Sequence, residues 1–148
     1  MPRNVLYIDD DEGLRRLVSR ALERDGIRVV SAPDGESGLR ALAAEEFDVI
    51  ALDKNMPGLD GLATLARIHA IANHPPVIFV TGNQDSKLIV TALKAGAFDY
   101  VVKGAQGEFM PLLKATFESA VRAMRLRRAV VATALPLRNE PVAASSKQ

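Results

Sequence analysis

The sequence contains no cysteine among its 148 residues. This absence excludes a disulfide framework and any metal site built from thiolate ligands, and it is compatible with a reducing compartment. Long apolar runs are also missing, so nothing in the sequence approaches the length of a membrane-spanning helix. The first residues, MPRNVLYIDDD, have only a short apolar stretch before an acidic cluster, which is typical neither of a signal peptide nor of a membrane anchor. We therefore expect a cytoplasmic protein that does not contact a membrane.

An excess of charge of one sign is absent as well, since the formal net charge is +1. So small a net charge gives no overall field that would attract nucleic acid or an anionic membrane. Neither common glycine-rich phosphate-binding pattern occurs. An arginine cluster near the C-terminus, at positions 122, 125, 127 and 128, is short and has no interleaved aromatic residues. It favours a solvated helix face or an extension toward a partner, and we expect no direct DNA binding.

What the sequence does contain is a regular alternation of short apolar runs and helix-period segments. The runs lie at 5–8, 27–30, 49–52, 77–80 and 100–102, and most are continuous, as in strands buried on both faces of a parallel sheet. Apolar residues at helical spacing follow each run, at 14–22, 39–42, 62–71, 88–93 and from about 108 onward. This alternation predicts a doubly wound α/β sheet with right-handed crossovers, but it does not fix the order of the strands.

The alternation predicts one domain over residues 1–128. The closing segment, 129–148, ends in a stretch that is rich in alanine, serine and proline and poor in aromatic residues. Such a composition is typical of a flexible tail, and a truncated linker to a further domain would look much the same. We expect residues 129–148 to be one of these two.

Polar side chains follow four of the predicted strands, at the edge where an open α/β sheet forms its ligand sites. They are Asp9-Asp10-Asp11-Glu12 after the first run, Asp53 after the third, Thr81 after the fourth and Lys103 after the fifth. Each has an ordinary explanation alone, because acids and hydroxyls at such positions often cap helices or organise turns. Their convergence on one edge indicates a functional site.

Clustered carboxylates without histidine or cysteine suit a hard cation such as Mg²⁺. A carboxylate beside Mg²⁺ can attack phosphorus and form an aspartyl phosphate. Phosphoryl transfer depends mainly on positioning and on stabilising the charge of the transferred oxygens, which an ammonium and a hydroxyl can do. The residues at this edge therefore predict phosphoryl-transfer chemistry.

Four segments, LYIDDDEGLRRL, DVIALDKNMPGLDGL, PVIFVTG and AGAFDYVVK, resemble in order and spacing the receiver domain of bacterial two-component response regulators. The resemblance spans roughly residues 4–125. It implies a flavodoxin-like fold, with five parallel strands in the order 2-1-3-4-5 and five helices. It also implies that Asp53 is the phospho-acceptor, and that Asp9, Asp10, Asp53 and the backbone carbonyl of Asn55 hold Mg²⁺.

The resemblance assigns roles to further residues. The Asn55 side chain is implied to help set the lifetime of the phosphoryl group, and Thr81 and Lys103 to contact its oxygens. Tyr100 matches the family's switch aromatic, which turns toward the interior when Thr81 is drawn to the phosphoryl group. Asp11 has no counterpart in the family pattern, so we interpret it as a helix cap.

The implied function is a phosphorylation-dependent switch. Asp53 would accept a phosphoryl group from a sensor histidine kinase or a histidine phosphotransfer protein, and the surface of the fourth helix, fifth strand and fifth helix would then change. Such a protein is not a conventional enzyme, since it promotes only its own phosphorylation and dephosphorylation. We expect the signal to reach a downstream protein or an output domain outside this sequence, and phosphorylation-dependent homodimerisation is left open.

The sequence departs from the family pattern at three positions. Gly104 follows the lysine where the family usually has a cis proline, so we expect a trans peptide there. Gly82 replaces the more usual alanine after Thr81, which would widen access to Asp53 and speed loss of the phosphoryl group. Lys54 stands beside the acceptor, where its charge would affect docking of a kinase.

Three other classes of protein remain as alternatives. A flavodoxin-like cofactor carrier would need a phosphate-binding loop after the first strand, where this chain has four acids. An inert receiver that serves only as an interaction module would not need all of the site positions filled. A haloacid-type phosphatase would need a cap domain, although Asp9 and Asp11 have the spacing of its two acids.

Overall fold

The computed structural model describes residues 2–56, 58–82, 84–104 and 107–145, with side chains as far as residue 132. Strands and helices alternate strictly along these residues. The strands are β1 (Asn4–Ile8), β2 (Arg28–Ala32), β3 (Val49–Asp53), β4 (Val77–Thr81) and β5 (Asp99–Val102). The helices are α1 (Glu12–Arg24), α2 (Gly35–Ala44), α3 (Gly61–His69), α4 (Ser86–Lys94) and α5 (Phe109–Ser145). The strands are parallel and lie in the order β2-β1-β3-β4-β5, which confirms the predicted flavodoxin-like fold.

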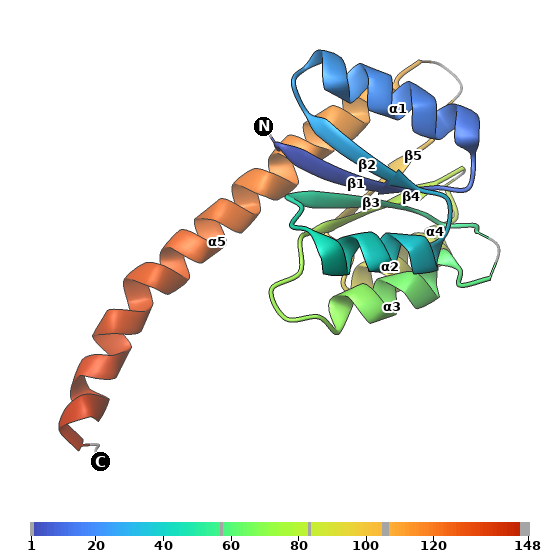
Figure 1. The fold of residues 1–148 in the computed structure, drawn as a ribbon. Coiled ribbons are helices and arrows are strands. Elements are labelled where there is room, and N and C mark those ends of the chain that lie inside the picture. Colours follow the sequence, from blue (N-terminus) through green and yellow to red (C-terminus); the bar gives the residue numbers. More distant parts are fainter. Residues whose placement is uncertain (1, 57, 83, 105–106, 146–148) are drawn as a thin grey trace.

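Helices cover both faces of the sheet (Figure 1). α1 and α5 pack on one face, where Leu22 and Phe117 belong to one apolar cluster. α2, α3 and α4 pack on the other, where Leu65 and Ala92 belong to a second cluster. Since both faces are covered, every residue of β3 and β4 is buried, as the continuous apolar runs predict.

β2 begins one residue later than the apolar run at 27–30 predicts. The N–H of Ile27 donates to the carbonyl of Leu22, and the N–H of Gly26 donates to that of Glu23. Gly26 has a φ of 78°, the left-handed conformation that commonly ends a helix. Ile27 therefore belongs to the C-terminal cap of α1, and its buried side chain does not mark the strand.

α5 is longer than the sequence predicts. Its first half is buried through residues such as Leu113, Phe117 and Val121, and the helix then continues to Ser145 and projects from the domain (Figure 1). Residues 129–145, for which we expect a flexible tail or a truncated linker, continue this helix in the structure. The division into a domain over 1–128 and a tail or linker over 129–148 stays a prediction. None of the helices in the described residues is both long and apolar enough to cross a membrane.

Candidate functional site

The predicted site residues lie at the carboxyl edge of the sheet, where the strand ladder fixes their backbones. Asp53 ends β3 and pairs in register with Val80, and Thr81 ends β4 and pairs with Val102. Beyond the last paired residue of β5, the N–H of Lys103 donates to the carbonyl of Thr81 at 2.8 Å. Main-chain hydrogen bonds therefore position the acid, the hydroxyl and the ammonium before any side-chain contact is formed.

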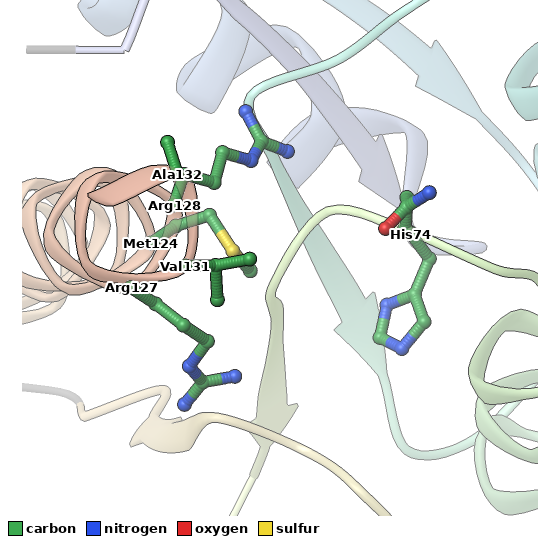
Figure 2. Close-up of a pocket in the computed structure, with 7 residues that line it drawn as sticks. His74, Met124, Arg127, Arg128, Val131 and Ala132 are labelled. Carbon is green, nitrogen blue, oxygen red and sulfur yellow. The ribbon is translucent and has the colours of Figure 1, made fainter. Parts of the chain in front are cut away.

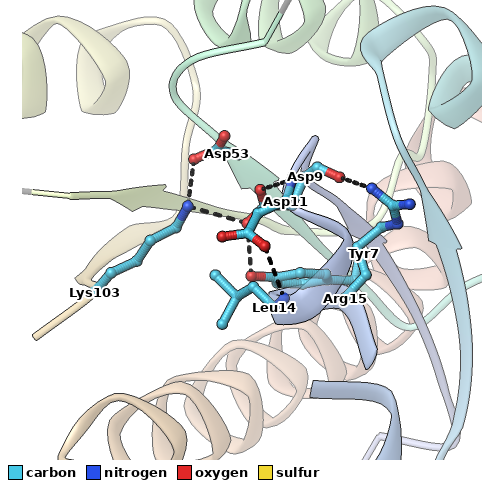
Figure 3. Close-up of polar contacts among 7 residues, drawn as sticks. All are labelled: Tyr7, Asp9, Asp11, Leu14, Arg15, Asp53 and Lys103. Carbon is cyan, nitrogen blue, oxygen red and sulfur yellow. Dashed lines mark hydrogen bonds and ion pairs between the residues drawn. The ribbon is translucent and has the colours of Figure 1, made fainter. Parts of the chain in front are cut away.

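Lys103 connects two acids that come from different strands (Figure 3). Its Nζ donates to Asp53 Oδ1 at 2.9 Å and lies 3.1 Å from Asp9 Oδ2. The order of the strands means that this side chain reaches from the end of β5 past β4 to the ends of β3 and β1. One ammonium thus neutralises part of the negative charge that two carboxylates bring to this edge.

Asp9 is fully buried and is held by several donors (Figure 3). The Tyr7 hydroxyl donates to Oδ2 at 2.9 Å, and the Asp11 N–H donates to Oδ1 at 3.0 Å. The Arg15 guanidinium donates to the Asp9 carbonyl at 2.8 Å. Burial raises the pKa of the Tyr7 phenol, and the nearby charge of Asp9 raises it further, so Tyr7 remains a neutral donor.

The carboxyl of Asp53 has a weaker preference for the charged form than an ordinary aspartate in water. Burial raises the pKa of its carboxyl to about 6, the charge of Asp9 adds to this effect, and the hydrogen bond from Lys103 opposes it. Burial alone would lower the pKa of the Lys103 ammonium, but the hydrogen bond and charge of Asp53 and the charge of Asp9 raise it above its ordinary value. The Lys103 ammonium therefore stays protonated, and further positive charge near Asp53 would favour ionisation of its carboxyl.

Three carboxylates of this edge are close enough to share one cation. Asp9, Asp10 and Asp53 each offer an oxygen, and these oxygens lie within 4.8 Å of one another. Asp10 is exposed whereas the other two are buried, so the cluster opens to solvent on one side. An oxygen-only set of this kind fits Mg²⁺, which prefers carboxylates together with water.

Asp11 is the next residue after Asp10 but has a different role. Its Oδ1 accepts from the Leu14 N–H at 3.0 Å, and it is the N-cap of α1. The interpretation of Asp11 as a helix cap is confirmed.

The remaining predicted residues lie on β4, on β5 and in the loop after β3. Thr81 is fully buried at the end of β4, and Asn55 is exposed two residues beyond Asp53. Tyr100 is half-buried on β5, where it packs against the apolar cluster beneath α4 and lines a cavity of about 420 Å³ together with Leu112 of α5. The Lys103–Gly104 peptide is trans, as expected in the absence of proline.

Two contributors, Tyr7 and Arg15, are not predicted from the sequence. Tyr7 lies two residues before Asp9, and because side chains two apart on an extended chain share a face, this spacing is a usable signal. Arg15 contacts a backbone carbonyl from the first turns of α1, and no pattern in the sequence indicates such a contact.

Comparison with known proteins agrees with this geometry. The sequence pattern of the response regulator receiver domain matches residues 5–113. The transcriptional regulatory protein CseB of Streptomyces coelicolor is 42% identical over 104 residues, which are 70% of this chain and 44% of CseB. The transcriptional regulatory protein PrrA of Mycobacterium tuberculosis is 35% identical over 129 residues, which are 87% of this chain and 52% of PrrA.

Solved structures give the same result. A response regulator receiver domain protein from Clostridium thermocellum superposes with a TM-score of 0.74 at 31% identity, over 84% of this chain and 98% of that one. The chain spans about half the length of the two curated relatives above. Because the family pattern covers most of its length, the chain belongs to the response regulator receiver domain family.

Proposed function

We propose that this chain is a phosphorylation-controlled switch in which Asp53 is the phospho-acceptor. The observation that carries the proposal is the Lys103 ammonium, which binds Asp53 at 2.9 Å and Asp9 at 3.1 Å at one edge of the sheet. A buried carboxylate with an ammonium at hydrogen-bond distance has both the nucleophile and a stabiliser for the oxygens of an incoming phosphoryl group.

In the proposed reaction, an oxygen of Asp53 attacks the phosphorus of a phosphohistidine on a sensor kinase or histidine phosphotransfer protein. The P–O bond to Asp53 forms, the P–N bond breaks, and its electron pair returns to the imidazole nitrogen. Lys103 and Thr81 then contact the new phosphoryl oxygens. The protein promotes only its own phosphorylation and dephosphorylation and is not a conventional enzyme.

The residues that would hold Mg²⁺ are Asp9, Asp10 and Asp53, with the backbone carbonyl of Asn55. When bound there, Mg²⁺ would supply positive charge against the phosphoryl oxygens. The cluster of three carboxylates within 4.8 Å supports this assignment. The Asn55 side chain is exposed, a position from which it would influence how quickly water reaches the phosphoryl group.

The signal would leave through the surface formed by α4, β5 and α5. Thr81 moves toward the phosphoryl group, and Tyr100 then turns from its half-buried position toward the interior, so that the surface shifts between two states. Tyr100 and Leu112 of α5 line one cavity, so a turn of the ring would alter this surface directly. The recipient is a downstream protein or an output domain outside these residues, in the cytoplasm. Homodimerisation on phosphorylation is one form of output, whereas direct DNA binding by these residues is not expected.

Phosphorylation with a small donor tests the proposal. Acetyl phosphate with Mg²⁺ should add the mass of one phosphoryl group to the wild type and none to Asp53→Asn. Asp60→Asn is a matched control, because Asp60 is an exposed acid of the same loop that caps α3. Equal labelling of wild type and Asp53→Asn would place the acceptor elsewhere. A complete lack of labelling would favour an inert interaction module.

A further inference from the structure

A second concavity lies at the opposite, amino-terminal edge of the sheet, where α5 leaves the domain (Figure 2). Its volume is about 480 Å³, within the range of small-molecule sites. The residues that line it come from the segment before β4 and from α5: Asn73, His74, Met124, Arg127, Arg128, Val131 and Ala132.

The pocket has an uncompensated positive charge. Arg127 and Arg128 extend from α5 on either side of Met124 and Val131 (Figure 2). Within the described part of the chain, neither guanidinium has an ion-pair partner, and no acid lines the pocket. Arg128 also borders a neighbouring cavity that is lined by acids, at positions 45, 46 and 48, but it forms no ion pair with them. Each unpaired guanidinium group presents five N–H donors in one plane, which suits a phosphate or a carboxylate.

The rest of the pocket is apolar or already satisfied. Met124, Val131 and Ala132 offer apolar surface between the two arginines. His74 Nδ1 lies 2.7 Å from the Pro75 carbonyl, and because a carbonyl only accepts, this nitrogen carries a proton. His74 Nε2 lies 3.3 Å from His69 Nδ1, so both ring nitrogens are engaged and the ring acts as a fixed wall opposite α5. The pocket therefore presents a cationic rim around an apolar surface.

We propose that this pocket binds a small organic anion, with its apolar body against Met124 and Val131 and its phosphate or carboxylate at the arginine rim on either side of them. The last buried side chain of α5 in the described residues is Val121, so the turns that follow are not held by the core. A ligand here would join those turns to His74 and fix the direction in which α5 leaves the domain. The inference rests on different residues from the phospho-acceptor site and does not depend on it.

Amide chemical shifts measured by NMR test the proposal, with phenyl phosphate as the probe and without Mg²⁺, so that the acidic edge repels the probe. Saturable shifts are expected around residues 73–74 and 124–132. Inorganic phosphate lacks the apolar body and phenol lacks the charge, so each should bind about tenfold more weakly or worse. Equal binding of inorganic phosphate, or saturable shifts centred on Asp53, would overturn the proposal.

Matched arginine variants give a second measurement. The double variant Arg127→Ala/Arg128→Ala should weaken phenyl phosphate about tenfold or more, because it removes both charged donors. Arg125→Ala removes another exposed arginine of α5 that does not line the pocket, and it should leave the affinity unchanged. Equal weakening in both variants would mean that binding depends on the overall positive charge of α5 and not on this pocket. The melting temperature of each variant verifies that it is folded.

Discussion

Asp9 and Asp53 are both buried carboxylates, but they have different surroundings. Asp9 accepts hydrogen bonds from Tyr7 and from the Asp11 N–H, and it also pairs with Lys103. Asp53 accepts only from Lys103 among the described residues, through Oδ1. No buried side-chain oxygen of these residues lacks a partner, so the second oxygen of Asp53 reaches solvent. The proposed nucleophile is thus the acid with an oxygen available to a donor.

The raised pKa of Asp53 predicts a pH-dependent stability. The folded-state pKa is about 6 against an ordinary 3.8, so this group stabilises the fold below about pH 4, and the stabilisation is lost as the pH rises through 6. Without Mg²⁺, Asp53→Asn should therefore be more stable than the wild type at about pH 7.5, by on the order of 1–3 kcal/mol. The difference should shrink toward zero at about pH 4. Thermal melts of both proteins in EDTA measure it, and a difference independent of pH would contradict the assignment.

Tyr7 provides a second prediction at this scale. Tyr7→Phe removes the hydroxyl that donates to the buried Asp9 and should cost about 1–3 kcal/mol of unfolding free energy, because a hydrogen bond to a charged group is lost. Tyr100→Phe is the control, since the Tyr100 hydroxyl has no hydrogen bond within the described residues. Urea unfolding gives both values. Similar losses in the two variants would mean that the Tyr7–Asp9 bond contributes nothing specific.

The sequence predicts which residues reach the site better than it predicts how they contact one another. Asp9, Asp53 and Lys103 each follow an apolar run, and the shared edge of a parallel sheet brings them together. The bridge from Lys103 to both acids depends on the strand order, which periodicity leaves open. It also depends on the conformation of a long side chain, which no sequence pattern fixes. The donors around Asp9 depend on burial, which no local pattern expresses.

At the scale of elements, the start of α3 is packed against the backbone of the proposed acceptor. A Cβ on Gly61 would lie 2.5 Å from the Asp53 carbonyl oxygen and 2.8 Å from that of Lys54. Both contacts are with backbone, which cannot move aside as a flexible side chain could. The helix can begin so close to β3 only because residue 61 has no side chain.

Gly61→Ala should therefore push α3 away from β3. We expect a loss of about 1–3 kcal/mol in unfolding free energy and slower labelling by acetyl phosphate, because Asp53 is displaced. Gly13→Ala is the matched control in α1, where the nearest atom to the new Cβ is Asp11 Oδ1 at 3.4 Å and alanine favours the helix. Chemical unfolding and the labelling rate test both. An unchanged unfolding free energy of Gly61→Ala would show that α3 can shift away from β3 without loss of stability.

The types of the elements are predicted correctly from periodicity, whereas some of their ends are not. β2 starts after Ile27 because that residue caps α1, and an apolar residue in a cap has the same appearance in the sequence as one in a strand. α3 ends at His69, so Ile71, which continues the helical spacing, lies beyond the helix. Caps and turns are set by backbone hydrogen bonds, to which apolar spacing is insensitive.

For the whole molecule, α5 divides into a buried and a projecting part. The side chains that pack on the sheet end at Val121, and the exposed Leu126 and Val130 follow. Removal of residues 129–148 should therefore leave the melting temperature within about 2–4 °C of the full chain, since no buried side chain of the described core is lost. Labelling of Asp53 should also be unchanged. A large fall in melting temperature would show that the domain does not end near residue 128.

The bridge formed by Lys103 has a consequence for local opening. β5 is an edge strand, paired only with β4, and would otherwise be expected to separate from the sheet more readily than the inner strands. When β5 separates from β4, the Lys103 ammonium that follows it moves away, and the negative charges of Asp9 and Asp53 are no longer neutralised. The hydrogen-exchange protection factors of the β5 amides should thus report the charge state of the pocket. They should become smaller when acid protonates the carboxylates or when a bound cation neutralises them in place of Lys103.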